Sequence, residues 1–374
     1  MRQAARDQWR PGSRVLDSAV VGQDGTYRSP LLDRSGAVAA DPPDDGVAAH
    51  YGDPLREQRG LTESVAVVDR SHRGVLRIGG PDRLSWLHSL TTQHLEALAP
   101  WSATQALVLS PHGHAEHDLR LFDDGEATWI DVEPGTATAL LAFLDSMRFL
   151  LRVDPRDVTE EWAVLSASGP DLPGQLSVPA PGQARRDGGM LVRRPAPGFP
   201  AAAAALPAVD LLVPRAEFPS VADRLAPLAG ITAYEALRVA AGAPRLARDT
   251  DHRTIPHEVG WLSTAVHLDK GCYRGQETVA RVHNLGRPPR RLVLLHLDGT
   301  AGQLPAHAAP VSWEGRTVGF VGTAAWHYEL GPIALAMVKR AVPDGATVAV
   351  DGHPALVEPL PGLRTGDLAR AGRG

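Results

Sequence analysis

The segment with the most evident chemical potential is the octapeptide Lys-Gly-Cys-Tyr-Arg-Gly-Gln-Glu at residues 270–277, which holds the one cysteine of the chain, Cys272. A single cysteine cannot form an internal disulfide, and alone it cannot complete a zinc or iron–sulfur site. Because nearby positive charge favours the thiolate, Lys270 and Arg274 predict a reactive thiol at Cys272. The competing interpretation is a small buried side chain, which free cysteine commonly is.

Polar side chains are dense over residues 249–291, and three kinds of site are compatible with them. A histidine could activate Cys272 as a nucleophile, but the spacing matches no hydrolase signature. Histidines could bind a metal, but this stretch has no His-x-x-x-His pair. Glycines could bring the backbone close to a small molecule. The side chains concerned are Asp251, His252, His257, Glu258, His267, Lys270, Cys272, Gln276, Glu277 and His283.

A second group of histidines, His112, His114 and His117, lies near the Pro-His-Gly turn at residues 111–113. A solvated turn explains these three side chains as well as a zinc site does. We therefore expect no metal site in this chain.

The composition narrows the class of protein. The chain has 374 residues with a net charge of −5 and acidic and basic residues mixed along its length. This length allows two or three domains, and the charge gives no broad footprint for nucleic acid. No apolar run approaches the ~20 residues of a membrane helix, and the N-terminus lacks the apolar core of a signal peptide. We therefore expect a cytoplasmic protein that does not contact membranes.

Hydrophobic periodicity predicts a mixed α+β protein that ends in an all-β unit. A turn-rich linker at residues 41–46 follows a possible strand near 17–21, and the Pro-, Gly- and Ala-rich stretch 170–207 predicts long loops. Short strands with regular turns after residue 290 predict a small barrel. The predicted helices are 53–59, 81–90, 136–149, 218–228 and 233–241, and the predicted strands before the barrel are 64–68, 74–78, 103–110, 116–122, 127–132 and 209–213.

Residues 270–277 resemble the signature of the YgfZ-type folate-binding proteins, which are relatives of the T-protein of the glycine cleavage system, an aminomethyltransferase. Three other stretches resemble T-protein motifs: Tyr-Glu-Ala-Leu-Arg-Val-Ala-Ala-Gly at 234–242, Thr-Ile-Pro-His-Glu at 254–258, and Leu-Ser-Trp-Leu-His-Ser-Leu-Thr-Thr-Gln at 84–93. The resemblance covers about residues 50–350 and is strongest at 231–296.

The resemblance implies three domains around a central folate channel, two of them ferredoxin-like and the last a β-barrel. It implies an N-terminal extension at 1–48, a first folate-binding domain at 49–156 plus 234–285, a second ferredoxin-like domain at 157–233 and a barrel at 286–365. The implied cofactor is tetrahydrofolate or a derivative.

The resemblance also implies roles for individual residues. Asp118 falls on the pterin-site aspartate of the family, whose preceding aspartate is replaced here by His117, and Arg238 falls on an arginine associated with folate binding. Cys272 would be the functional thiol, with Lys270 and Arg274 favouring its thiolate. The remaining residues of the signature that are expected to contact the cofactor are Gly271, Tyr273, Gly275, Gln276 and Glu277.

Four functions follow from the resemblance. The first is a folate-binding accessory protein for the assembly or repair of iron–sulfur enzymes, with these clients or assembly factors as partners and a monomeric state. The second is a tetrahydrofolate-dependent aminomethyltransferase; the T-protein loop Gly-Tyr-Thr-Gly-Glu is not visible near residues 197–200, which counts against it. The third is a folate-dependent oxidase or demethylase, for whose cofactor domains the chain leaves little room. The fourth is a binding module or a folate-dependent tRNA-modification factor.

Overall fold

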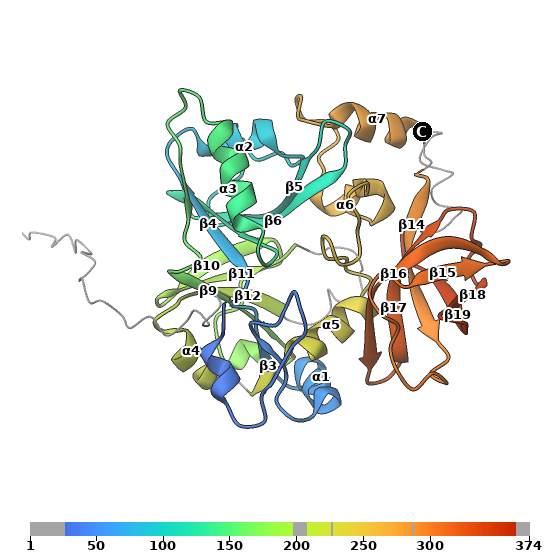
Figure 1. Cartoon of the computed structure of the whole chain (residues 1–374). Helices are drawn as coiled ribbons and strands as arrows, with labels where there is room; N and C mark the ends of the chain where they lie inside the picture. Colours follow the sequence, from blue (N-terminus) through green and yellow to red (C-terminus); the bar gives the residue numbers. More distant parts are fainter. Residues whose placement is uncertain (1–26, 197–207, 226, 286–287, 364–374) are drawn as a thin grey trace, which may run out of the picture.

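The computed structural model describes residues 27–196, 208–225, 227–285 and 288–363 (Figure 1). The strand expected near residues 17–21 and the Pro-Gly-Phe-Pro segment at 197–200 lie outside this range. The described part contains a five-stranded antiparallel sheet, a six-stranded mixed sheet, a short two-stranded sheet and a closed barrel, with helices, as expected for the α+β class.

The first sheet has five strands in the order β5-β6-β7-β4-β8, with α2 and α3 on its outer face (Figure 1). Alternate residues of its strands, such as Leu119 and Leu121, face these helices in one apolar cluster with Leu87 and Leu140. This two-residue period is typical of a strand that has one face on an apolar core. The elements are β4 (Gly74–Gly79), α2 (Arg83–Leu90), β5 (Ala103–Leu109), β6 (Ala115–Asp123), β7 (Ala127–Val132), α3 (Ala137–Ser146) and β8 (Asp154–Asp157).

The second sheet has six strands in the order β10-β11-β12-β9-β3-β13, and α4 packs on its outer face. Only β13 runs parallel to its neighbour, β3. The elements are β3 (Ala66–Asp69), β9 (Trp162–Ser168), β10 (Gln183–Asp187), β11 (Met190–Arg194), β12 (Ala208–Pro214), α4 (Phe218–Leu225) and β13 (Leu228–Ala229).

Two features of this sheet differ from the sequence-based expectations. The region 170–207 was expected to form loops, but β10 and β11 form a hairpin in which Asp187 pairs with Met190. Its turn is Gly188-Gly189, a two-residue hairpin signal that the high Pro and Gly content of the region concealed. In addition, β3 pairs with β9, so this strand belongs to the second sheet and not to the expected first domain at 49–156.

The two sheets pack face to face. Their inner faces are apolar at one end of this contact and charged at the other. At one end the contact is apolar, with Phe122 and Trp129 against Leu191 and Leu212. Two residues further along each of these strands, the side chains are charged: Arg120, Asp131, Arg193 and Asp210. Residues two apart on a strand lie on the same face of the sheet. The charged side chains therefore lie on the same inner faces as the apolar ones.

The C-terminal unit is a closed barrel in the strand order β14-β17-β16-β15-β18-β19, which confirms the predicted C-terminal barrel. Arg290 on β14 joins the barrel to the preceding segment through Asp251, at 2.6 Å, and Glu258, at 2.9 Å. The strands are β14 (Arg290–Leu297), β15 (Pro310–Trp313), β16 (Arg316–His327), β17 (Gly331–Lys339), β18 (Thr347–Val350) and β19 (His353–Pro359).

Short elements connect these three units. Helix α5 lies between the barrel and the two sheets (Figure 1) and packs against α1 and β16. No helix within the described ranges is long and apolar enough to span a bilayer. The connecting elements are η1 (Pro30–Asp33), β1 (Val38–Ala39), β2 (Ala48–His50), α1 (Pro54–Glu63), η2 (Leu172–Gly174), α5 (Ile231–Ala240), η4 (Pro256–Glu258), α6 (Leu262–Ala265) and α7 (Gln276–Leu285).

Candidate functional site

The charged half of the contact between the two sheets forms what we call the central ionic network. Arg193 joins the two sheets, because its guanidinium lies 2.5 Å from Asp131 of the first sheet and 2.6 Å from Asp210 of the second. Acids and arginines alternate from there toward α5, so nearly every buried charge has an opposite partner. The members are Arg70, Asp210, Arg193, Asp131, Arg73, Glu133, Arg245, Asp44, Glu235, Arg238 and Asp249.

Asp118 lies at the edge of this network, on the inner face of β6, and is 3% exposed. Its Oδ1 accepts a hydrogen bond of 2.7 Å from Gln105 Nε2. Burial raises the pKa of the Asp118 carboxyl, against the opposing effects of Arg120 and the Gln105 hydrogen bond. Its Oδ2 has no hydrogen-bond partner among the residues that the structure describes, so this oxygen is available to a ligand.

Arg238, the second residue expected to contact folate, is buried and fully engaged by the protein. Its guanidinium donates to Glu235 and Asp249, to Thr323 Oγ1 and to the Ala243 carbonyl. These bonds use all five N–H donors of the side chain. The pair that Arg238 forms with Glu235, three residues before it on α5, is also buried and is not a surface ion pair. We therefore propose that Arg238 positions Glu235 and Asp249 and does not itself contact a ligand.

Two residues near Asp118 were not among the predicted site residues. Arg120 is half-buried on β6, and no hydrogen bond or ion pair of its guanidinium occurs within the described ranges. Tyr234, in the first turn of α5, has the Arg70 guanidinium 4.5 Å from its ring centre. A sequence signal for Arg120 did exist, since it stands two residues after Asp118 on a predicted strand and must share its face.

The signature segment begins in the loop between α6 and α7 and continues into the first residues of α7. We call this loop, residues 266–275, the thiol loop. Cys272 is exposed in this loop, so the interpretation as a buried apolar side chain is wrong. Tyr273 next to it is buried in an apolar cluster with Leu107 and Leu109 of β5. Arg274 pairs with Glu116 of β6 at 3.0 Å. The loop is thus attached to the β5–β6 hairpin, the start of the strand that carries Asp118.

Lys270 has two contacts that the sequence did not predict. Its ammonium donates to the carbonyls of His88 and Thr91, at the C-terminal end of α2, where helix carbonyls lack intrahelical partners. Burial lowers its pKa to about 8. The structure therefore gives Lys270 an anchoring contact for the thiol loop, and the expected action on the Cys272 thiol stays a prediction.

Of the remaining residues of the signature, two shape the thiol loop and two lie on the surface. Gly275 fits tightly against the β5–β6 turn, and Gln276 donates to the Lys270 carbonyl at 3.4 Å, so both shape the loop. Gly271 is exposed, and Glu277 pairs with Arg281 on the surface of α7. A cofactor contact for these residues and for Tyr273 stays a prediction.

The histidines do not assemble into a metal site. Within the described ranges, no group of three or more His, Cys, Asp or Glu side chains is arranged to hold a metal ion. His112 and His114 lie with ring centres 6.1 Å apart near the turn. His117 has a pKa lowered to about 4 by burial, so it is neutral at pH 7.

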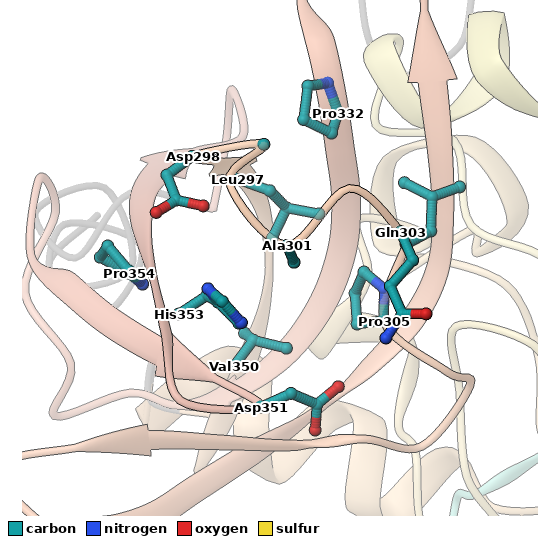
Figure 2. Close-up of a pocket in the computed structure, with 12 residues that line it drawn as sticks. Leu297, Asp298, Ala301, Gln303, Pro305, Pro332, Val350, Asp351, His353 and Pro354 are labelled. Carbon is teal, nitrogen blue, oxygen red and sulfur yellow. The ribbon is translucent and has the colours of Figure 1, made fainter.

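A small cavity of about 110 Å³ lies on the barrel, between the loop after β14 and the β18–β19 turn (Figure 2). Asp298, Asp351 and His353 are its charged or titratable lining residues, beside Pro332 and Pro354. Pockets for drug-sized ligands have volumes of about 300 Å³ or more. None of the predicted site residues lines this cavity, so we assign no site to it.

The two glycines of the signature provide a matched test of the thiol loop. A Cβ at Gly275, where φ is 81°, would lie 2.5 Å from the Ser110 carbonyl oxygen, whereas one at Gly271 would meet nothing within 4 Å. We expect Gly275→Ala to lower the free energy of unfolding by about 2 kcal/mol and to accelerate tryptic cleavage at Arg274, because strain and overlap displace the loop. Gly271→Ala should change neither. Equal behaviour of the two variants in urea unfolding and proteolysis contradicts the packing described for Gly275.

Comparisons with known proteins agree with this architecture. The family model of the glycine cleavage T-protein N-terminal domain matches residues 48–176, and that of its C-terminal barrel domain matches residues 290–358. The aminomethyltransferase of Rubrobacter xylanophilus is 29% identical over 92% of this chain and 96% of its own. That of Parasynechococcus marenigrum is 27% identical over 79% of this chain and 86% of its own.

A solved structure has the same fold. The glycine cleavage system aminomethyltransferase T from Bartonella henselae superposes with a TM-score of 0.77 at 18% identity, covering 90% of this chain and 96% of that one. The two family models, the relatives and this fold show that the chain belongs to the glycine cleavage T-protein superfamily.

Proposed function

We propose that this chain is a cytoplasmic folate-binding accessory protein that supports iron–sulfur proteins, with tetrahydrofolate or a derivative held between the two sheets. The observation that carries the folate part is Asp118, a buried carboxylate with one oxygen bound to Gln105 and the other without a partner in the described part of the chain. Such an oxygen can accept hydrogen bonds from the N–H groups of a pterin edge.

The surroundings of Asp118 support a ligand role over a purely structural one. The carboxylates of the central ionic network, such as Asp131 and Asp210, contact arginines, whereas Asp118 contacts a neutral amide. A carboxylate retained for stability alone would be expected to have a cationic partner when buried. Asp118 is therefore the acid of this region best placed to complete its hydrogen bonds with a bound molecule.

Binding of folate is tested by titrating the protein with tetrahydrofolate and following the fluorescence of its eight tryptophans. Replacement of Asp118 by Asn should weaken binding roughly 10- to 100-fold, because the amide presents an N–H where the ligand needs an acceptor. A matched control is Asp157→Asn, an exposed acid at the edge of the same sheet. Identical affinities for the wild type and Asp118→Asn would remove Asp118 from the site, and absence of binding to the wild type would remove the proposal.

The iron–sulfur part rests on the exposure of Cys272 within the YgfZ-like signature. An exposed thiol can engage a client protein, exchange with a disulfide or contact iron transiently. We expect Cys272→Ser to fold normally but to fail to restore iron–sulfur enzyme activity in cells that lack this protein. Cys272→Ala serves as a second variant without a hydroxyl, and full restoration by either one excludes a role for the thiol.

A second candidate is a tetrahydrofolate-dependent aminomethyltransferase, which the names of the relatives favour. Asp210, the acid that follows the expected position of the T-protein glutamate loop, accepts bonds from Arg70, Arg193 and Ser166. Its carboxylate is therefore occupied by protein donors. Turnover of an aminomethylated lipoyl carrier with tetrahydrofolate would establish this activity, and a folate-dependent role in tRNA modification would require a defect in modified nucleosides.

A further inference from the structure

Arg120 differs from the other arginines between the two sheets because its guanidinium has no hydrogen-bond or ion-pair partner among the described residues. Arg73 donates to Asp131 at 2.7 Å, Arg193 to Asp210 at 2.6 Å, and Arg70 to Asp210 at 3.3 Å. The Arg120 guanidinium has no hydrogen bond and no ion pair within 4 Å in the described part of the chain. Its backbone carbonyl is used, since it accepts a bond from Arg193, so the strand itself is fixed in place.

The surroundings keep this guanidinium charged. Burial opposes its charge, but Tyr234, Asp118, Asp210 and Asp131 outweigh burial and hold the pKa of Arg120 well above its ordinary value. A charged donor that is partly removed from water without a hydrogen-bond partner is costly, and a bound acceptor removes that cost. Arg120 thus has both the charge and the free donors that a ligand oxygen requires.

Tyr234 supplies a second free group beside it. No hydrogen bond of its hydroxyl occurs among the described residues, although the side chain is half-buried. Burial opposes ionisation of this phenol, but Arg70 and Arg120 outweigh it and lower the pKa of Tyr234. A phenol with a lowered pKa is a stronger hydrogen-bond donor than an ordinary one.

The acceptor and the donors share one surface. Asp118 and Arg120 are two residues apart on β6, so their side chains leave the same face of the sheet, roughly 7 Å apart at the backbone. Gln105 stands opposite Arg120 in the register of β5 and β6 and donates to Oδ1 of Asp118. This bond fixes the carboxylate and leaves Oδ2 as the free acceptor next to the free donors of Arg120.

We propose, on the basis of the folate-binding function above, that Arg120 and the Tyr234 hydroxyl donate to the ring carbonyl oxygen of the bound pterin while Asp118 accepts from the adjacent N–H groups. A lactam edge carries this pair of acceptor and donor side by side. An analogue with an amino group in place of the carbonyl would direct N–H donors at a guanidinium, which has no acceptor. Arg120 therefore makes the site selective for 4-oxo over 4-amino pteridines.

The test measures the affinities of two probes, 5-formyltetrahydrofolate and its 4-amino-4-deoxy counterpart, for the whole chain. Wild type should bind the 4-oxo probe at least about 10-fold more tightly. Replacement of Arg120 by Met should cost roughly 10- to 100-fold for the 4-oxo probe and much less for the 4-amino probe, so that the preference disappears. Arg120→Lys should keep part of the preference, because it retains the charge and donors.

Two further variants make the result decisive. Arg156→Met, at an exposed arginine on β8 of the same sheet that pairs with Asp154, should leave both affinities unchanged. Arg120→Gln retains donors and much of the side-chain length, and it is compared with wild type by circular dichroism if the Met variant does not fold. Binding of both probes by wild type with an unchanged preference in Arg120→Met and Arg120→Gln would overturn the role of Arg120 and leave folate binding intact. Failure of wild type to bind either probe would remove both proposals.

Discussion

Replacement of Arg193 by Met should lower the free energy of unfolding by about 3 kcal/mol. Arg193 lies 2.5 Å from Asp131 and 2.6 Å from Asp210, and these acids are 0% and 5% exposed. Removing the arginine leaves two buried carboxylates short of a cation, which costs about 3–5 kcal/mol for a buried pair. Arg73 and Arg70 still contact these acids, which places our value at the lower end of that range. Urea-induced unfolding at pH 7 measures the change.

The control for this prediction is Arg152→Met. The Arg152 side chain is 73% exposed and pairs with Asp82 on the surface, where water screens the charges. The urea midpoint of the Arg152→Met variant should equal that of the wild-type protein. The double variant Arg193→Met with Asp131→Asn should recover part of the lost stability, because it removes one uncompensated carboxylate. If the single variant is as stable as wild type, the two sheets are not held together by Arg193.

Replacement of His257 by Phe should make the protein more resistant to acid. His257 is 7% exposed in η4, and neither ring nitrogen has a hydrogen-bond partner within the described residues. Burial, assisted by the nearby His283, lowers the pKa of His257 to about 4. Between pH 6.5 and pH 4 the unfolded chain therefore binds a proton at this position that the folded chain does not.

The sign of the effect follows from this difference. The contribution of His257 to stability is complete above pH 6.5, falls as the pH is lowered and is about 3 kcal/mol smaller near pH 4. Phenylalanine has no titrating group and loses no hydrogen bond, so the difference in stability between the His257→Phe variant and the wild-type protein should grow over this window. His252→Phe, at an exposed histidine of the same segment, is the control. Parallel stability curves for wild type and His257→Phe between pH 7 and pH 4 would contradict the assignment.

The α+β class and the C-terminal barrel could be predicted from local patterns, whereas the order of the three units was implied only by the resemblance. The strands β5, β6 and β7 coincide with predicted strands, and the helices α3 and α5 carry apolar residues at helical spacing. The β10–β11 hairpin differs from the predicted loops because the high Pro and Gly content of the region conceals the Gly188-Gly189 turn signal. The sheet that β3 joins could not be predicted, since its partner β9 lies about a hundred residues away.

The candidate site was predictable only in part. The hydrophobic pattern predicted the strand that carries Asp118, and the resemblance assigned this residue to the pterin site. In the part of the chain that the structure describes, one of its oxygens accepts from Gln105 and the other has no partner. The sequence could not distinguish Arg238, whose five donors are all bound within the protein, from Arg120, whose donors have no partner within the described ranges. Nor could it show that the Lys270 ammonium is directed at the end of α2 while the Cys272 thiol is exposed.

The sequence alone determined the α+β class, the terminal barrel and the presence of a distinctive thiol segment, because periodicity and short motifs are local properties of the chain. The tertiary structure decided which charged side chains neutralise one another and which remain available to a ligand. That choice depends on how the two sheets pack against each other. In the sequence, Arg193 and Arg120 are both arginines on strands, and only the packing of the sheets brings the Arg193 guanidinium within 2.5 Å of Asp131 and 2.6 Å of Asp210.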